Sequence, residues 1–258
     1  MSELKPPPKN VLITGAAQRI GRAIALNLAA SGYGVVVHYN RSQKEAEALV
    51  GEISHSGGQG VALKADLAVE SETASLIPQA LEALGPLGCL INNASRFEED
   101  NPETTDRESW DAHMETNLRA PFVLMQAFRA QLAADRSGNI INLIDQRVWN
   151  LTPFFTTYTL SKTGLWTLTQ TMAMALAPNI RVNAIGPGPT LKSERQSDAQ
   201  FARQKQSTPL KRGTSAEEIA AAVAFILQAP AMTGQMIALD GGQHLGWAQF
   251  DTDYRPEE

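Results

Sequence analysis

Short apolar runs alternate along this chain with longer stretches in which apolar residues recur every three or four positions. The runs, which we expect to be buried strands, lie at 10–14, 34–39, 61–65, 89–92, 139–144, 181–185 and 235–239. The amphipathic stretches, which we expect to be helices, lie near 21–31, 43–56, 71–84, 106–133, 157–177 and 216–228. Strands separated by helices need right-handed crossovers, which predicts a parallel sheet covered on both faces. The sequence therefore predicts an α/β fold with one domain over residues 1–258.

Capping and breaking residues set several of the helix boundaries. Ser42 with Glu45 is typical of a capping box at the start of the second helix, and Ser215 with Glu218 is typical of one at the start of the last helix. Pro178 is expected to end the helix that precedes it.

Composition narrows the class of protein. With 43% hydrophobic and 19% charged residues, the chain can bury a sizeable core, and its net charge of −5 argues against a general nucleic-acid binder. Cys89 is the only cysteine, which excludes an intrachain disulfide, and its apolar neighbours predict a packed thiol. No apolar run reaches the length of a membrane span, and the opening MSELKPPPKN lacks signal-peptide character. We expect a cytoplasmic protein with no membrane partner and no metal.

The first predicted strand leads through a tight glycine turn into a helix, in the sequence VLITGAAQRIGRAIALNLAASG. Such a turn aims backbone N–H groups and the positive end of the helix at a phosphate. Gly15 permits the turn, and Gly21 lets the helix approach the strand closely. A plain strand–helix turn has the same two glycines, so this pattern alone leaves both a nucleotide site and a structural turn open.

A second group of candidate residues follows the run at 139–144, which ends at Asp145. The helix expected after it carries Tyr158 and Lys162, and a separation of four residues places both side chains on one face. A lysine ammonium near a phenol favours the phenolate and lowers a pKa that is ordinarily about 10, so the tyrosine can exchange protons near neutral pH. An ordinary helix with a surface tyrosine and lysine shows the same spacing.

Together these motifs resemble the short-chain dehydrogenase/reductase superfamily. The matching residues stand in the family's order and at its spacing, and they are Thr14-Gly15, Ile20-Gly21, Asn92-Asn93-Ala94, Asn117, Tyr158 and Lys162. The match runs from about Val11 to Gly242. The resemblance implies a Rossmann fold with a seven-stranded parallel sheet. It also implies assembly as a homotetramer or a homodimer.

Two departures from the general family pattern point to a subgroup. The family's turn usually has a glycine where this chain has Arg19, and its catalytic serine usually stands where this chain has Asp145. The segments TGAAQRIGRAIA, HYNRS, NNASRF, IINLIDQ and YTLSK are similar to those of pteridine reductases and bacterial dihydromonapterin reductases. Members of that subgroup carry both substitutions, so the resemblance implies an active pterin-type reductase. A degenerate, inactive relative is the other explanation for the departures.

The end of the second predicted strand indicates NADPH as the cofactor. A site that prefers NAD usually presents an acid there to hold the ribose 2′-hydroxyl, and this chain has none in HYNRS. Arg41 offers a planar cationic fork, and Ser42 begins a helix whose N–H groups point outward, so both suit a 2′-phosphate. The alternative is that Arg41 is a solvated charge and Ser42 only a cap.

The resemblance extends the cofactor site to several strand ends. The full set of predicted cofactor-binding residues is Gly15, Arg19, Ile20, Gly21, His38, Tyr39, Asn40, Arg41, Ser42, Asp66, Leu67, Asn92, Ala94, Ser95, Tyr158, Lys162, Pro187 and Gly188. The resemblance implies that Asp66 contacts the adenine, although Asp66 also suits a plain turn after the third strand. It implies that Asn92 and Ala94 line the ribose of the nucleotide. Pro187-Gly188 is expected to border the nicotinamide.

The predicted catalytic residues are Asp145, Tyr158, Lys162 and Asn117. By resemblance, Lys162 holds the nicotinamide ribose and Asn117 anchors a water relay, the alternative being a polar helix residue that faces solvent. As an anion beside Tyr158, Asp145 would hold the phenol protonated. Reduction of a C=N bond needs a proton on nitrogen, so this acid pair suits an imine better than a ketone. Asp145 also suits a purely structural role as a hydrogen-bond acceptor.

Substrate binding is assigned by the same resemblance to Arg19, Ser95, Phe97, Asp145 and Tyr158. Phe97 matches the position that sandwiches a pterin against the nicotinamide, although a core or lid phenylalanine is the alternative. Aromatic residues in the loop before the Tyr158 helix suit either a pocket wall or packing, and they are Trp149, Phe154 and Phe155.

Three further segments are less specific. The acidic run at 98–100 is expected to be a solvated loop. From about 188 to 212 the pattern turns irregular, in the region that covers the substrate in this family. Near the end of the chain, an aromatic tail of Trp247, Phe250 and Tyr254 suits either a subunit interface or a frayed terminus.

Two other functions compete with pterin reduction, whose substrate the sequence leaves open among dihydromonapterin, dihydrobiopterin, dihydrofolate and oxidised pterins. One is an NADPH-dependent reductase that acts on a ketone such as a 3-oxoacyl thioester; Asp145 and Arg19 count against it. The other is a dinucleotide-binding sensor without catalysis; the intact Asn117, Tyr158 and Lys162 count against that.

Overall fold

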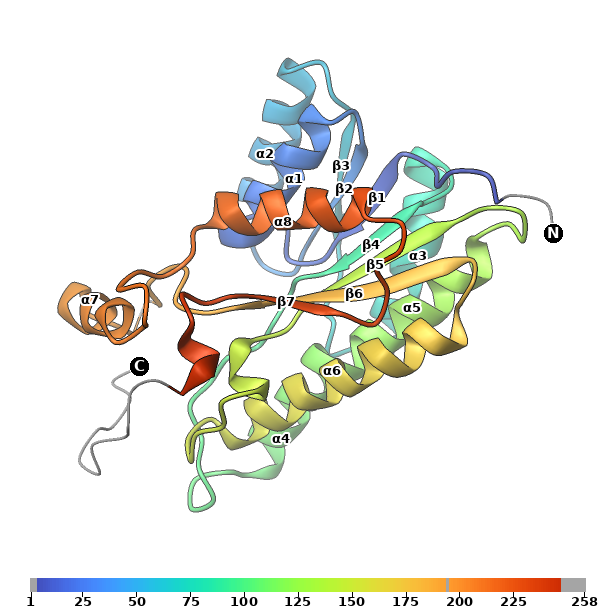
Figure 1. Cartoon of the computed structure of the whole chain (residues 1–258). Helices are drawn as coiled ribbons and strands as arrows, with labels where there is room; N and C mark the ends of the chain where they lie inside the picture. Colours follow the sequence, from blue (N-terminus) through green and yellow to red (C-terminus); the bar gives the residue numbers. More distant parts are fainter. Residues whose placement is uncertain (1–3, 194, 247–258) are drawn as a thin grey trace.

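A single parallel sheet organises the molecule. The computed structural model describes residues 4–193 and 195–246, and over these residues seven strands lie in the order β3-β2-β1-β4-β5-β6-β7 (Figure 1). The strands are β1 (Asn10–Ile13), β2 (Gly34–Tyr39), β3 (Gly60–Lys64), β4 (Cys89–Asn92), β5 (Gly138–Leu143), β6 (Ile180–Pro187) and β7 (Met236–Leu239). Every strand lies within two residues of its predicted run, so the α/β prediction is confirmed.

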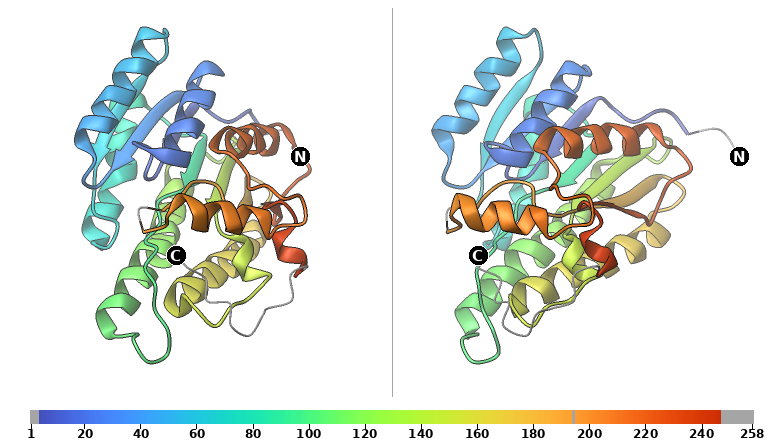
Figure 2. Two further views of the ribbon diagram at one scale, coloured as in Figure 1. Left: turned by 90° about the vertical axis from the view of Figure 1, so that its left-hand side faces the viewer. Right: turned by 60° about the vertical axis from the view of Figure 1, so that its left-hand side comes forward.

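Helices cover both faces of this sheet (Figures 1 and 2). One layer consists of α1 (Arg19–Ala30), α2 (Gln43–His55) and α8 (Ala216–Gln228), and the other of α3 (Glu70–Leu84), α5 (Ala120–Gln131) and α6 (Thr156–Ala175). Side chains alternate along β1, so Leu12 joins the core under α3 and α5 while Ile13 joins the core under α1 and α8. Cys89 is buried in the second of these cores, as predicted, and burial raises the pKa of its thiol to about 12.

The helix predicted near 106–133 is divided. It consists of α4 (Arg107–Met114), a π-helical turn η1 (Glu115–Arg119) and then α5. Pro121 has no N–H to donate, so the helix cannot continue there with its usual hydrogen bonds. The π turn also carries Asn117, whose side chain is held by the loop after β4, and a π turn inside a helix often marks a functional position.

Two of the three predicted helix boundaries have the expected geometry. Ser215 and Glu218 form a capping box at α8, and α6 ends at Ala175, shortly before Pro178. The capping box predicted at α2 is wrong, because the hydroxyl of Ser42 makes no capping hydrogen bond. The backbone of Ser42 has φ −89° and ψ 57° rather than the extended conformation that aims a capping side chain at the helix.

The segment at 188–212 contains a helix that the irregular pattern did not predict. Helix α7 (Asp198–Gln206) starts with a capping box between Ser197 and Gln200, and it has no buried residue. Without a buried face, α7 has no apolar periodicity to reveal it. Figure 1 shows it beside the carboxyl ends of the strands, and the left view of Figure 2 shows it lying across those ends.

The strand order places the ligand site. β1 lies between β2 and β4, so the connections that leave β1 and β4 diverge to opposite faces and open a crevice at the carboxyl ends of these strands. Within residues 4–193 and 195–246, no helix is both long and apolar enough to cross a membrane. The aromatic tail, Trp247, Phe250 and Tyr254, lies outside the described residues.

Candidate active site

The glycine turn after β1 has the geometry that the sequence predicts. Gly15 has φ +62°, a left-handed conformation that suits glycine. A Cβ placed on Gly21 would lie 2.3 Å from the Gly15 carbonyl oxygen, so only glycine lets α1 start this close to the strand. The residue before the helix, Gln18, makes no side-chain cap, and the first turn of α1 holds no acid. The N-terminus of α1 therefore suits an anion such as a diphosphate.

Arg19 occupies a position with φ +54°, which explains why glycine is usual there. A non-glycine residue in this conformation costs about 1 kcal/mol or more, so its side chain is expected to have a use. The guanidinium donates hydrogen bonds to the carbonyl oxygens of Leu191 and Lys192, at 3.1 and 3.0 Å. Arg19 therefore joins the predicted nucleotide turn to the segment at 188–212.

The side chain of His38 supports the glycine turn after β1. Its Nδ1 accepts the Gly15 N–H at 3.0 Å, which leaves Nε2 to donate to the Ala65 carbonyl oxygen at 3.1 Å. Burial lowers the pKa of His38 to about 4, so the ring is neutral. Tyr39 is also buried, whereas Asn40 and Arg41 are exposed and available to a ligand.

The other predicted cofactor residues lie around the same crevice with different degrees of access. The carboxylate of Asp66 accepts the Ala68 N–H at 3.0 Å, which is the plain turn role. The side chain of Leu67 packs in the core, so only its backbone can meet a ligand. Asn92 donates to the Asn142 amide oxygen at 2.8 Å.

Thr14 holds the end of β4 against the end of β1. Its hydroxyl oxygen accepts the N–H groups of Asn93 and Ala94, at 2.9 and 3.0 Å. At the end of β6, Pro187 and Gly188 line the pocket described below, where they were expected to border the nicotinamide.

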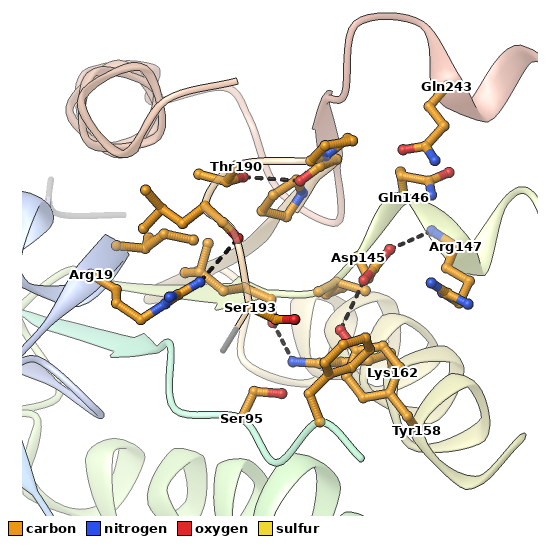
Figure 3. A pocket seen from close by; sticks show the side chains of 18 of the residues that line it. Arg19, Ser95, Asp145, Gln146, Arg147, Tyr158, Lys162, Thr190, Ser193 and Gln243 are labelled. Atoms are coloured by element: carbon orange, nitrogen blue, oxygen red, sulfur yellow. Dashed lines mark hydrogen bonds between the residues drawn. The ribbon is translucent and has the colours of Figure 1, made fainter. Parts of the chain in front are cut away.

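The predicted acid pair forms a direct hydrogen bond. The Tyr158 hydroxyl donates to Asp145 Oδ2 at 2.9 Å, and the Arg147 N–H donates to Asp145 Oδ1 at 2.7 Å (Figure 3). Asp145 thereby caps the short helix η2 (Gln146–Val148) while it holds the phenol. The structural role as a hydrogen-bond acceptor is therefore present, and the second oxygen leaves the predicted chemical role of Asp145 open as a prediction.

Lys162 lies under the same pair, one helical turn from Tyr158. Its ammonium donates to the Leu143 carbonyl oxygen at 2.9 Å and lies 5.8 Å from the centre of the Tyr158 ring. Burial lowers the pKa of Lys162 to about 8, and the negative charge of Asp145 opposes that shift.

Asn117 is fully buried, which excludes the solvent-facing alternative. Its Oδ1 accepts the Arg96 N–H at 2.7 Å and the Ser95 hydroxyl at 3.3 Å. Its Nδ2 donates to the Arg96 carbonyl oxygen at 2.9 Å and to the Ser161 hydroxyl at 3.0 Å. All four hydrogen-bonding positions of the amide are used, so the side chain holds the loop after β4. The predicted water relay stays a prediction.

Phe97 lies against Tyr158, the predicted catalytic tyrosine. Its ring meets the Tyr158 ring edge to face, with centroids 4.7 Å apart, and stacks in parallel on Phe155 at 4.8 Å. Phe155 is buried and does not line the pocket, so its interpretation as packing is correct. Trp149 packs against Trp166 and His244 instead of the pocket.

One pocket brings together the predicted substrate residues. It is lined by Arg19, Ser95, Phe97, Asp145 and Tyr158, together with Lys162, Pro187 and Gly188 (Figure 3). The segment at 188–212 forms another part of its wall through Thr190, Leu191, Ser193, Gln196, Phe201 and Gln204. Within the part of the chain that the structure describes, no three His, Cys, Asp or Glu side chains gather as a metal site would require.

Sequence reasoning missed several polar residues in this wall. Gln146 and Gln243 lie at one end of the pocket, and Gln146 is 6% exposed with no hydrogen-bond partner for its Oε1 among the described residues. The position of Gln146 directly after Asp145 was the available signal. Gln243 comes from the opposite end of the chain, so nothing local marked it.

The acidic run at 98–100 is solvated only in part. Glu99 is exposed, but the prediction is wrong for Asp100, which is 2% exposed. Its carboxylate lies at the start of α6, where it accepts the Thr157 N–H at 3.1 Å.

Comparison with known proteins places this geometry in a family. A family model described as "Enoyl-(Acyl carrier protein) reductase" matches residues 15–244. The 3-oxoacyl-[acyl-carrier-protein] reductase FabG of Staphylococcus epidermidis is 35% identical over 242 residues, which cover 92% of this chain and 99% of the relative. A short-chain type dehydrogenase/reductase of Picea abies is 32% identical over 90% of this chain and 91% of the relative.

Among solved structures, similarity is higher. FolM alternative dihydrofolate reductase 1 of Brucella canis, crystallised with NADP, is 48% identical with a TM-score of 0.91, over 94% of this chain and 96% of that chain. The Brucella suis protein of the same name, also with NADP, has the same identity and TM-score over 94% and 97%. With its matching fold, glycine turn and Tyr158–Lys162 pair, this chain belongs to the short-chain dehydrogenase/reductase family.

Proposed function

We propose that this protein is an NADPH-dependent reductase that transfers a hydride to a C=N bond of a pterin of the dihydropteridine, dihydromonapterin or dihydrofolate type. The observation that carries the proposal is the hydrogen bond from the Tyr158 hydroxyl to the Asp145 carboxylate inside the pocket. The likeness to two FolM alternative dihydrofolate reductases, at 48% identity, supports the same substrate class.

The residues at the end of β2 fit NADPH. Arg41 is exposed, no acid stands in the segment at 38–42, and the Ser42 hydroxyl is not used as a helix cap. A cationic fork beside an uncommitted hydroxyl suits a 2′-phosphate. The uncapped start of α1 suits the diphosphate of the same cofactor. The solved FolM relatives were crystallised with NADP, which supports this choice.

The Tyr158–Asp145 pair favours a nitrogen substrate over a ketone. A carboxylate only accepts hydrogen bonds and a ketone offers only an acceptor, so a ketone has no donor with which to replace the bond from Tyr158 to Asp145. A pterin ring carries N–H groups beside its C=N bonds. An N–H donated to Asp145 would replace the bond from Tyr158 and free the phenol proton for the reacting nitrogen.

The neighbouring side chains supply orientation and charge. When bound, NADPH supplies the hydride. The Lys162 ammonium lies beneath the Tyr158 ring and stabilises the phenolate that remains after proton transfer. Phe97 already lies edge to face with Tyr158, so a flat ring between Phe97 and the nicotinamide would lie beside the proton donor. Stacking on Phe97 would contribute about 0.5–1.5 kcal/mol beyond burial of the ring.

A substitution of Asp145 tests whether this carboxylate selects a pterin over a thioester. NADPH oxidation is measured with 7,8-dihydropterins, dihydrofolate and an acetoacetyl thioester, in the native protein and in Asp145→Ser. We expect turnover restricted to pterins and dihydrofolate in the native protein. In the variant, pterin turnover should fall by about 10²-fold or more. The neutral serine hydroxyl accepts the pterin N–H more weakly than the Asp145 carboxylate, which carries a negative charge. Turnover of the thioester alone by the native protein would contradict the proposal.

A second candidate is reduction of a 3-oxoacyl thioester, because FabG proteins of Staphylococcus epidermidis and Staphylococcus aureus are 35% identical to this chain over nearly its whole length. The same substrate panel decides between the two. NADPH binding without any turnover would instead support a sensor.

Assembly stays a prediction of the resemblance, and location stays a prediction of the sequence pattern. We propose a homotetramer in the cytoplasm, and light scattering of the purified protein tests the assembly.

A further inference from the structure

The helix that carries Tyr158 is capped by a residue from a distant loop. Phe155, at the start of α6, has φ +58° and provides no side-chain cap. Asp100, in the loop after β4, takes that role: its Oδ1 accepts the Thr157 N–H at 3.1 Å and its Oδ2 accepts the Thr157 hydroxyl. The Asp100 carbonyl oxygen also accepts the Phe155 N–H at 2.8 Å. The Thr156 N–H donates to the same carbonyl oxygen at 3.4 Å, so four bonds to one residue fix the first turn of this helix.

His113, on α4, sets the direction of these hydrogen bonds. The Glu98 N–H donates to His113 Nε2 at 3.1 Å, so the proton of the neutral ring is on Nδ1. That nitrogen lies 3.0 Å from the Ser109 carbonyl oxygen and 2.7 Å from the Thr157 hydroxyl oxygen. Because Nδ1 is a donor, the Thr157 hydroxyl must donate onward to Asp100. Burial lowers the pKa of His113, in agreement with a neutral ring.

This buried cluster, which consists of Asp100, His113 and Thr157, lies behind the pocket without lining it. Thr157 directly precedes Tyr158 in α6. Phe97 lies three residues before Asp100 in the same loop, and its ring touches both Tyr158 and Phe155. The cluster thus fixes the loop that carries Phe97 and the helix that carries Tyr158 relative to each other.

We propose that Asp100 is a positioning residue, which acts through Thr157 and His113 to hold the Tyr158 hydroxyl in register with Phe97 and Asp145. The carboxylate accepts from two donors of Thr157 and cannot itself donate, so the cluster has one hydrogen-bond arrangement. An amide at this position would turn an N–H₂ group toward the threonine hydroxyl, which already receives the His113 N–H. The arrangement would then have to open at one of its bonds.

The decisive variants are Asp100→Asn and Thr157→Val, with Thr157→Ser as the conservative rescue and Glu99→Gln as the exposed neighbouring control. The turnover readout rests on the proposed function. We expect kcat with the pterin substrate to fall about 10–100-fold in the first two variants, since a misplacement of about 1 Å costs about 10²-fold. KM and the NADPH dissociation constant should stay within about threefold, because the cluster does not line the pocket. Thr157→Ser and Glu99→Gln should keep kcat near that of the native protein.

Turnover is expressed per NADPH-binding site, so poorly folded protein does not count as a loss of kcat. Unchanged kcat in Asp100→Asn and Thr157→Val would overturn the proposal, and so would an equal loss in Thr157→Ser. A second readout needs no substrate: the ionisation of Tyr158, followed by ultraviolet absorbance against the same variant with Tyr158→Phe. Asp100→Asn should change the pH of that ionisation, and an unchanged value would overturn the positioning role. Failure of the proposed function would instead appear as a native protein that reduces no pterin.

Discussion

The two sides of the pocket are held by different kinds of interaction. On one side, Tyr158 and Lys162 are 6% and 3% exposed, and each donates a hydrogen bond to an acceptor on or after β5. On the other side, the segment at 188–212 is held by Arg19, which reaches two of its backbone carbonyl oxygens, and by Arg195, which bonds to the Phe97 carbonyl oxygen and to Glu98. The side chains of Arg195 and Glu98 are 45% and 43% exposed.

On the proposed function, we expect this difference to separate the chemistry from the selection of substrate. Buried hydrogen bonds hold the reacting groups in one geometry, and breaking one leaves an unpaired polar group that costs about 1–3 kcal/mol. Exposed ion pairs contribute little, so we expect that the segment at 188–212, which we call the covering segment for its predicted role, can change sequence or move without loss of the fold. We therefore expect large effects on turnover from the first side and small effects, mainly on KM, from the second.

Among all the variants proposed, Tyr158→Phe should cause the largest loss of turnover. The variant keeps the ring that packs against Phe97 but loses the hydroxyl that donates to Asp145. Loss of a general acid typically costs about 10²–10⁴-fold, so kcat should fall by that factor. NADPH affinity, measured by fluorescence titration, should change little. A variant that retains a tenth or more of the native kcat would contradict the role of Tyr158 as proton donor.

The pH profile tests whether Lys162 must be charged. Because burial lowers its pKa to about 8, the ammonium loses its proton above that pH. We expect kcat/KM, which reports the free enzyme, to fall about tenfold per pH unit above pH 8. The profile is measured with subsaturating pterin in buffers of constant ionic strength. A profile that stays flat to pH 10 would show that the charge is not needed.

The free energy of unfolding should rise over the pH range in which kcat/KM falls. A loss of activity caused by alkaline unfolding would instead come with a lower free energy of unfolding. The pKa of Lys162 is lower in the fold than its ordinary 10.5, so above pH 8 the unfolded chain binds more protons than the folded chain. The free energy of unfolding should therefore rise by about 1 kcal/mol from pH 8 to pH 9, measured by urea denaturation with Lys162→Met as the control. The raised pKa of Cys89 acts in the opposite direction as the pH approaches and passes 9, so the comparison stops there, and the difference from Lys162→Met, which keeps Cys89, gives the effect of Lys162.

The parts of the site that the sequence predicted depend on local spacing. Gly15 and Gly21 stand at fixed positions in one turn, and Tyr158 and Lys162 are four residues apart on one helix, so periodicity alone places them. The buried strand places Asp145 at a strand end, but its candidate role came from the family resemblance, in which a serine usually stands at this position. The family resemblance implied a seven-stranded parallel sheet, but the order of its strands came only from the structure, since periodicity indicates the strands but not their neighbours.

The missed parts depend on contacts between distant segments. Asp100 caps a helix through Thr157, which lies 57 residues later in the chain, and the two acidic residues before Asp100 made it look like part of a solvated loop. His38 belongs to a strand whose apolar pattern hides that its ring supports the glycine turn. Helix α7 is an exception, because Ser197 and Gln200 have capping-box spacing, which is a local signal that could have predicted its start.

Arg195→Ala should produce the smallest effect and so sharpens the comparison. It removes the bond to the Phe97 carbonyl oxygen and the ion pair with Glu98, which together tie the covering segment to the ring-stacking loop. Since exposed pairs contribute up to about 1 kcal/mol, KM for the pterin should rise by less than about fivefold, with kcat nearly unchanged. Lys192→Ala is the matched control, because its ion pair with Asp198 stays within the covering segment. Steady-state kinetics of both variants at low and high salt make the measurement, and salt should reduce the difference between native protein and Arg195→Ala. A tenfold loss of kcat in Arg195→Ala alone would mean that the exposed side of the pocket also positions the reacting groups.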